Sequence, residues 1–107
     1  MREQLEKLLA QGRDSALLRF GLGDACLKEH DAEHAAIHLA QATQQQPGYS
    51  AAWKLLGKAL HQLGRLDAAQ AAWTTGVSVA RQQGDLQAIK EMTVFLKRLQ
   101  KQQQAVA

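Results

Sequence analysis

Apolar and small residues recur at helical spacing along the second half of the chain. One face of the segment 49–63 is formed by Trp53, Leu56, Gly57 and Leu60. Spacings of three and four residues predict a helix there. Gly64 is suited to end that helix because glycine tolerates the left-handed backbone of a C-terminal cap. The segment 66–82 follows with its own inward stripe of Ala69, Trp73 and Gly76.

A similar pattern predicts a closing amphipathic helix over 86–101. Its apolar stripe consists of Leu86, Ile89, Met92, Leu96 and Leu99. Asp85 is placed to cap its N-terminus. Its last turns carry cations, which the helix dipole favours there, namely Lys97, Arg98 and Lys101. We expect residues 102–107 to fray.

Three further helices are expected before residue 49, at 2–11, 15–29 and 32–45. Their N-caps are expected at Asp14 or Ser15 and at Asp31, and Ser50 is expected to cap the helix over 49–63. Alanine and leucine dominate the composition, β-branched residues are scarce and there is one proline. This composition favours helix over strand, so the sequence predicts an all-α fold of about six helices.

The chain is similar to itself at a constant shift of about 34 residues, the length of one helical hairpin repeat. The shift superposes identical residues, namely Leu22 on Leu56, Gly23 on Gly57, Ala25 on Ala59 and Ala35 on Ala69. A repeat of this length indicates stacked helical hairpins. Leu5 lies one such period before Leu39, so residues 2–11 take the place of a second helix that has no first helix before it.

The spacing W-x2-L-G-x2-L, which begins at Trp53, resembles the tetratricopeptide-repeat (TPR) family. The first copy is similar but departs from the family at Arg19, Cys26 and His30, where an aromatic, a large core residue and a turn glycine are usual. The resemblance implies a single α-solenoid domain. Its expected parts are an N-terminal capping helix (1–14), two repeats (15–49 and 50–83), a C-terminal capping helix (84–101) and the frayed tail.

Charge is unevenly placed along the 107 residues, whose formal net charge is +3. Residues 1–49 carry five basic and seven acidic residues, whereas residues 50–107 carry eight basic and three acidic ones. This asymmetry suits an acidic partner segment or head-to-tail self-contact. Basic residues are too sparse, and aromatics too few, for a nucleic-acid partner. We expect no membrane span and a cytoplasmic protein.

The polar residues give little support for chemistry. Cys26 is the single cysteine and lies at a core position, so we expect neither a disulfide nor a nucleophile. His34 and His38 have the spacing of a helical metal site, and we expect at most adventitious zinc there. No phosphate-binding loop or nucleophile elbow is present, so we expect no enzyme, no cofactor and no dedicated metal site.

By resemblance to the family, the first helix of each repeat lines a concave groove that binds peptides. The expected groove residues are Leu17, Phe20, Asp24, Lys28, Lys54, Lys58 and His61, with Ala51 beside them. Phe20 would be an apolar anchor, and the lysines would attract an acidic partner. The carboxylate clamp of some family members does not carry over, because Phe20, Asp24 and Leu55 stand at its positions.

The resemblance therefore predicts an adaptor that binds a protein or peptide segment, and an acidic segment would suit the lysines. Two alternatives stay open. One is a structural module that assembles with itself, as a weak homodimer rather than a monomer, because three repeats are usually needed for a stable array. The other is a chaperone-like protein that holds an export substrate. The plainer alternative for the groove is a solvated basic face with Phe20 packed between helices.

Overall fold

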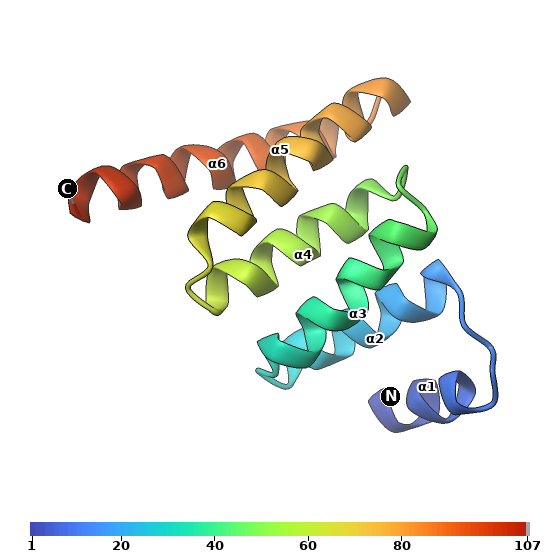
Figure 1. The fold of residues 1–107 in the computed structure, drawn as a ribbon. Helices are drawn as coiled ribbons and strands as arrows, with labels where there is room; N and C mark the ends of the chain where they lie inside the picture. Colours follow the sequence, from blue (N-terminus) through green and yellow to red (C-terminus); the bar gives the residue numbers. More distant parts are fainter. Residues whose placement is uncertain (107) are drawn as a thin grey trace.

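The computed structural model describes residues 1–106 and places six α-helices along them, with no strand in that range (Figure 1). The helices are α1 (Arg2–Ala10), α2 (Ala16–Lys28), α3 (Ala32–Gln45), α4 (Ser50–Gln62), α5 (Leu66–Gln83) and α6 (Leu86–Val106). The predicted all-α class and the six segments are confirmed. Helix ends agree closely with the prediction, apart from the end of α6.

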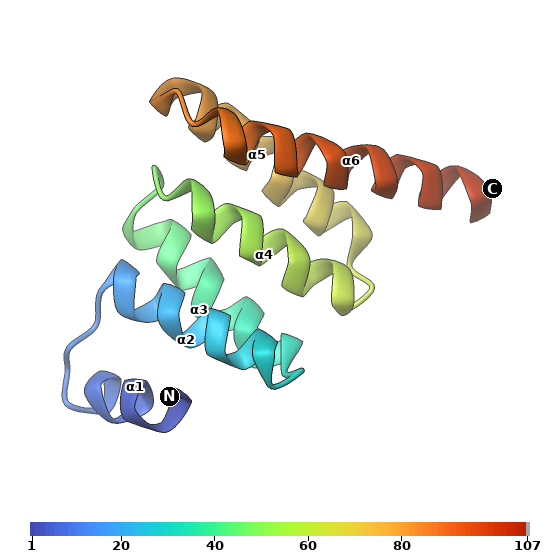
Figure 2. The ribbon, with the colours of Figure 1, turned by 180° about the vertical axis from the view of Figure 1, so that it is seen from behind.

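Each helix packs against the next one along the chain, as expected for stacked hairpins. In addition, α2 contacts α4 and α4 contacts α6, whereas no Cα atom of α3 lies within 8 Å of one of α5 in the described part of the chain. The first helices α2, α4 and α6 therefore lie closer together than the second helices α3 and α5 do, so the stack curves toward the side of the first helices. Figure 2 shows these three helices on the near side, with α3 and α5 behind them. The concave side is thus the layer α2–α4–α6.

Glycines allow the two helices of each hairpin to approach closely. A β-carbon added at Gly57 would overlap the Trp73 ring, and one added at Gly23 would overlap the Leu39 side chain. The two glycines are one repeat period apart, so both hairpins use the same contact. In the first hairpin, Leu39 stands at the position that Trp73 takes in the second. Leu39 is fully buried, so the smaller side chain also packs closely against its glycine.

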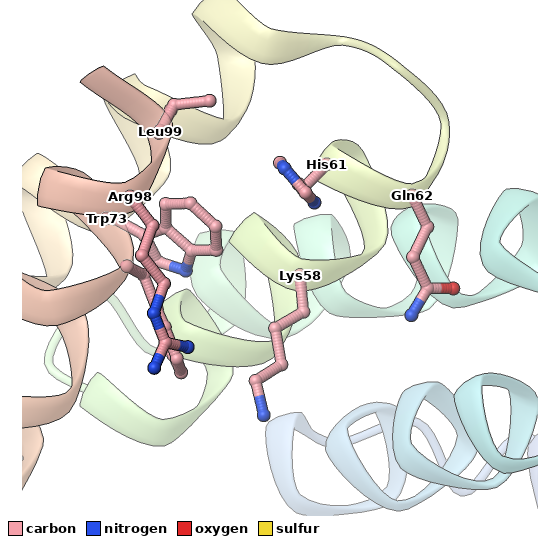
Figure 3. Close-up of a pocket in the computed structure, with 7 residues that line it drawn as sticks. Lys58, His61, Gln62, Trp73, Arg98 and Leu99 are labelled. Carbon is pink, nitrogen blue, oxygen red and sulfur yellow. The ribbon is translucent and has the colours of Figure 1, made fainter. Parts of the chain in front are cut away.

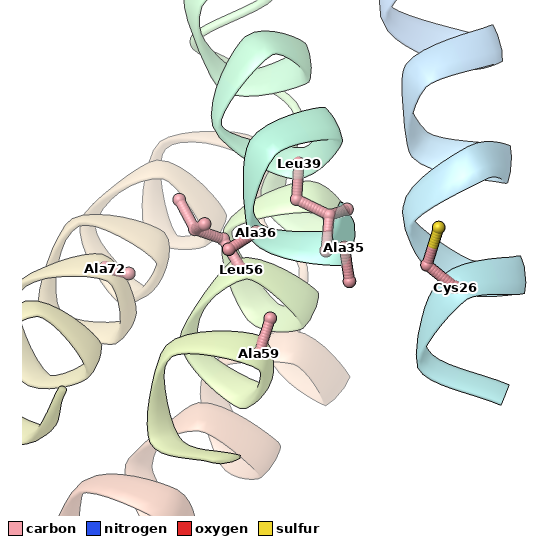
Figure 4. Packing of buried hydrophobic residues seen from close by; sticks show 7 residues of the cluster. All are labelled: Cys26, Ala35, Ala36, Leu39, Leu56, Ala59 and Ala72. Atoms are coloured by element: carbon pink, nitrogen blue, oxygen red, sulfur yellow. The ribbon is translucent and has the colours of Figure 1, made fainter. Parts of the chain in front are cut away.

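The buried residues form two clusters that join neighbouring hairpins. The first cluster, drawn in Figure 4, contains Cys26, Ala35, Ala36, Leu39, Leu56, Ala59 and Ala72. The second joins α5 to α6 through Ala69, Trp73, Val77, Ala80, Ala88, Met92 and Leu99. By contrast, α1 has no buried residue. The stack is therefore covered well by α6 at one end and thinly by α1 at the other.

Most of the predicted helix caps are confirmed. The side chain of Ser15 accepts a hydrogen bond from Leu18 N, that of Asp31 from His34 N, and that of Asp85 from Ala88 N. The prediction for Ser50 was wrong, because Tyr49 is the N-cap of α4 and makes no side-chain cap bond. Ser50 is instead buried as the first helical residue, where its small side chain fits.

Two turns use left-handed backbone at equivalent positions. Gly64 has φ of 74° after α4, and His30, one repeat period earlier, has φ of 61° after α2. Histidine tolerates this region less well than glycine. His30, which stands where the family usually has a turn glycine, is therefore a point of backbone strain in the first hairpin.

The C-terminal helix is longer than predicted. The predicted end at residue 101 was wrong, since α6 continues to Val106, while Ala107 lies outside the described residues. Glutamine and alanine are compatible with helix and no glycine or proline interrupts them. Gln102 Oε1 also lies 2.8 Å from His61 Nε2 of α4, which holds this part of α6 against the stack.

Candidate functional site

The seven expected groove residues fall into three places on the concave side. Leu17, Asp24 and Lys28 line a cleft between α1 and α2. Lys54, Lys58 and His61 lie on α4, and each of them meets a residue of α6. Phe20 lies between the two groups. No single pocket brings all seven residues together, since Leu17, Asp24 and Lys28 line one hollow and Lys58 and His61 line another.

The cleft between α1 and α2 has a volume of about 490 Å³. Its lining is mostly apolar and includes Met1, Leu5, Leu17, Gly21 and Ala25. Polar side chains at its edge include those of Lys28 and Asp24, which form an ion pair at 3.0 Å. The lysine is therefore already paired with a carboxylate of its own helix.

Phe20 packs between helices rather than standing free in a groove. Its ring stacks on Tyr49 with 4.9 Å between ring centroids. Phe20 is partly buried and contacts the first core cluster. Phe20 is only half-buried, and its substitution would also disturb the packing of α2 on the start of α4 through the loss of the Tyr49 contact.

The α4 residues are bound to the closing helix. Lys54 Nζ lies 3.3 Å from Glu91 Oε1. Lys58 Nζ lies 5.2 Å from the centroid of the Phe95 ring, which is a cation–π geometry. Together with the contact between His61 and Gln102, these contacts fix α6 along α4 and leave a hollow between them.

That hollow is a pocket of about 210 Å³ among α4, α5 and α6. It is lined by Lys58, His61, Gln62, Trp73, Phe95, Arg98 and Leu99. Figure 3 shows Arg98 reaching it from α6, and Lys58 and His61 from α4. The indole of Trp73 is oriented by its Nε1, which donates a hydrogen bond to Lys54 O at 3.0 Å. We call this the α4–α6 pocket.

The pocket carries positive charge that the fold leaves unpaired. Within residues 1–105, no carboxylate lies within 4.0 Å of Lys58 or Arg98. Lys58 is exposed on one side of the pocket and Arg98 is exposed on the other. An arrangement of two exposed cations beside aromatic rings can hold an anionic group by charge-assisted hydrogen bonds.

Sequence reasoning missed Phe95 and Arg98 as site residues. The predicted stripe of α6 included Leu86, which is 69% exposed, and omitted Phe95 and Ala88. Counting in steps of three and four residues from Met92, which is fully buried, reaches Ala88, Phe95 and Leu99. That count would have identified Phe95. Arg98 was interpreted only as a partner for the helix dipole.

The remaining polar candidates are engaged elsewhere. His34 Nδ1 lies 2.8 Å from Asp31 Oδ2, and His38 Nδ1 lies 3.3 Å from Arg19 Nη1. Burial, together with the nearby Arg19 guanidinium, lowers the pKa of His38. Burial also raises the pKa of the Cys26 thiol. Within the described residues, no three His, Cys, Asp or Glu side chains are grouped so that they could hold a metal ion, and none of the helices has the length and hydropathy of a membrane span.

Comparison with known proteins gives a consistent result. The tetratricopeptide repeat family model matches residues 27–92. The TPR repeat-containing protein PA0015 of Pseudomonas aeruginosa is 57% identical over 99 residues, which cover 92% of this chain and 94% of that protein. The solution structure of BPP2914 from Bordetella parapertussis has a TM-score of 0.82 and 43% identity, with coverage of 95% of this chain and 89% of that one.

A crystal structure of a tetratricopeptide repeat domain protein from Salinibacter ruber shares the fold, with a TM-score of 0.77 at 24% identity and coverage of 82% of this chain and 98% of that one. TPR folds generally mediate protein–protein interactions, and proteins built from them are generally non-enzymatic. From the extent of the family match and the identity to the Pseudomonas protein, this chain belongs to the tetratricopeptide-repeat family.

Proposed function

We propose that this protein is an interaction module that binds an acidic segment of a partner protein on its concave side, with the α4–α6 pocket as the main anchor point. The observation that supports this most directly is that Lys58 and Arg98, beside the pocket's aromatic rings, have no carboxylate partner among residues 1–105. The uneven charge of the chain supports it as well, since the basic half supplies this surface.

Lys58 and Arg98 would meet a carboxylate of the partner. An exposed cation without a carboxylate partner can steer an acidic segment toward the site and accelerate association at low salt. Lys54 is less suited to this role, because its ammonium group already lies 3.3 Å from Glu91. Of the three lysines expected to attract the partner, Lys28 and Lys54 are paired with carboxylates of this chain, so the proposed charge contact is made by Lys58 together with Arg98.

The floor of the pocket would take an apolar side chain next to that carboxylate. Trp73, Phe95 and Leu99 supply apolar surface, and the volume of about 210 Å³ is smaller than typical small-molecule pockets. A single anchoring side chain of a peptide suits this volume better than a cofactor does. The recognised feature would therefore be an aspartate or glutamate beside a leucine or phenylalanine.

A phage-displayed library of random peptides, selected on the purified protein, tests the proposal. We expect the selected peptides to be enriched in acidic residues adjacent to large apolar ones. One selected peptide, synthesised with a fluorescent label, then gives the affinity of each variant by anisotropy. The double variant Lys58→Glu/Arg98→Glu should bind at least about tenfold more weakly, which corresponds to about 1.4 kcal/mol, with the largest effect at low salt.

Lys7→Glu is the matched control, because Lys7 is an exposed cation on α1, remote from the pocket. It should leave the affinity unchanged. Phe95→Ala should weaken binding at both low and high salt, provided that its thermal melt shows a folded protein. If the double charge reversal binds the selected peptides as tightly as the wild type does, the α4–α6 pocket is not the binding site.

A further inference from the structure

The basic residues of α6 do not lie where the helix dipole would favour them, in contrast to the prediction. α6 continues to Val106, and its last turn carries no basic residue. Lys101 therefore lies before the turn in which the dipole stabilises a cation. Lys90 lies near the other end of the helix, which begins at Leu86, and that end of the dipole favours anions. The positive charge of α6 thus needs another explanation.

Four basic residues of α6 have no carboxylate of residues 1–105 within 4.0 Å. They are Lys90, Lys97, Arg98 and Lys101. Five basic residues on other elements do have such a partner, namely Arg2, Arg19, Lys28, Lys54 and Arg65. The acidic residue of α6, Glu91, pairs with Lys54 of α4. In the described part of the chain, the positive charge of α6 is therefore left without an internal counterion.

Three of these cations lie on one exposed face together with Val94. Lys90, Lys97 and Lys101 are exposed, and Val94 is 43% exposed. Their spacings of three, four and seven residues bring them together on the helix surface. We call these four residues the basic face of α6. Figure 2 shows α6 along one edge of the stack.

The basic face adjoins the α4–α6 pocket. Arg98, which lines the pocket, lies four residues after Val94 and three before Lys101, so it is a surface neighbour of both. Positive charge is therefore continuous from the pocket to the outer side of α6. Lys97 and Lys101 also repel each other, because they are like charges four residues apart on a helix. An acidic partner would relieve that repulsion.

The length of the basic face indicates the size of the partner segment. The eleven residues from Lys90 to Lys101 span about 16 Å at the helical rise of about 1.5 Å per residue. An extended chain advances about 3.3 Å per residue, so about five residues of a peptide cover that length. A short run of aspartate or glutamate residues therefore matches the face in both charge and extent.

The composition of the face favours an acidic protein segment over other anions. Binding of single-stranded nucleic acid uses aromatic side chains on which bases stack, and the basic face has none. A helix that lies on a membrane surface needs a broad apolar side beside its cations. Val94 is the only apolar residue of the basic face, which is too little for insertion into lipid.

We propose that the basic face of α6 binds a run of acidic residues in the partner protein, next to the part of the partner that enters the α4–α6 pocket. This inference rests on the proposed function, because it extends the same acidic partner beyond the pocket. The pocket selects an apolar side chain with a neighbouring carboxylate. The basic face adds affinity for partners in which further acidic residues follow, and it does so outside the concave side.

A fluorescent peptide of about ten glutamates tests the basic face without the pocket's apolar contact. The variant Lys90→Gln/Lys97→Gln/Lys101→Gln removes three charges and keeps a good helix former at each position. By anisotropy at low salt, we expect the wild type to bind this peptide and the variant to bind it at least about tenfold more weakly. Added salt should weaken the wild-type complex more than that of the variant, and circular dichroism melts should coincide.

The matched control is Lys7→Gln/Arg13→Gln/Lys28→Gln, which removes the same net charge from the opposite end of the stack. These three side chains are exposed on α1, the following turn and α2, whereas α6 contacts α4 and α5. This control should change the affinity for the glutamate peptide by less than about twofold, since screening confines charge effects to short range.

A second arm joins the face to the pocket. The selected peptide is extended at either end with about five glutamates, or with glutamines as the neutral control. The glutamate extension at one end should tighten binding to the wild type at least about tenfold over the glutamine extension. The variant Lys90→Gln/Lys97→Gln/Lys101→Gln should lose that gain and still bind the unextended peptide like the wild type.

The results separate this inference from the proposed function. A glutamate peptide that does not bind the wild type at low salt, or binds the triple variant of α6 equally well, overturns the inference. An oligothymidylate that binds the basic face more tightly than the glutamate peptide overturns it too, in favour of nucleic acid. If the glutamate peptide behaves as expected but Lys58→Glu/Arg98→Glu leaves the selected peptide bound, the basic face stands and the pocket is not the binding site.

Discussion

Replacing Gly57 by alanine tests the close packing of the hairpins. The added β-carbon would lie 2.5 Å from Cε2 of Trp73, and nearer still to two other atoms of the same ring. Trp73 is 4% exposed and its Nε1 donates to Lys54 O, so the ring can neither move into solvent nor turn without losing that hydrogen bond.

The expected magnitude follows from opposing terms. Alanine gains about 1 kcal/mol over glycine in a helix interior. Overpacking a well-filled site costs about 1–3 kcal/mol, and losing the Trp73 hydrogen bond costs about 1 kcal/mol more. The net destabilisation is therefore about 1–3 kcal/mol, which lowers the Tm of a domain of this size by roughly 5–15 °C.

Gly21→Ala is the matched control, because Gly21 is also inside a first helix. Its added β-carbon would meet only Cδ1 of Leu5 at 3.3 Å, and Leu5 lies on the thinly packed α1. The helix-propensity gain should dominate, so this variant should be as stable as the wild type or more stable by up to about 1 kcal/mol. Circular dichroism melts and urea titrations measure both. A Gly57→Ala protein that melts at or above the wild-type temperature would refute the hairpin packing described above.

Three other predictions concern the first hairpin. His30→Gly should stabilise the protein by about 0.5–1 kcal/mol in urea titrations, because His30 has φ of 61° and left-handed backbone is costly for a side chain with a β-carbon; an unchanged midpoint would argue against strain there. His38 has a lowered pKa in the folded state, so the unfolded chain binds its proton more readily, and stability should fall as pH drops below the ordinary value of 6.5. His38→Gln should flatten that part of the profile of stability against pH. Asp14 and Asp31, whose pKa values are lowered by Arg19 and by the His34 backbone N–H respectively, affect stability only at more acidic pH. Cys26 is fully buried, so its reaction with a thiol reagent should require opening of the fold and should become slower under conditions that stabilise the protein. Labelling at the rate of a free thiol would contradict its burial.

The internal repeat predicted the fold well because the residues that repeat are the ones that pack. Gly23 and Gly57 each contact a side chain of the second helix of their hairpin. Few residues other than glycine fit where two helix backbones come this close. Capping side chains at Ser15, Asp31 and Asp85 were also predictable, since each bond is local in sequence. These features depend on neighbours within one hairpin or one repeat.

The candidate site was less predictable because it depends on how α6 lies on α4. Lys54 and Lys58 look equivalent in sequence, since they are one helical turn apart, yet Lys54 pairs with Glu91 and Lys58 lies over Phe95. Both partners come from α6, a segment that follows the repeats and lacks their pattern. Tertiary packing therefore decides which of the two lysines is paired with a carboxylate, and the sequence pattern does not specify that packing.

The most direct test of the proposed binding site is an NMR titration of the isotope-labelled protein with a selected acidic peptide. The measurement is the change in backbone amide and Trp73 indole shifts, recorded at low protein concentration so that self-association is minimal. We predict that the largest changes cluster at Lys58, His61, Trp73, Phe95 and Arg98 around the α4–α6 pocket. Shifts confined to α3 and the outer face of α5, with the pocket signals unmoved, would contradict recognition on the concave side.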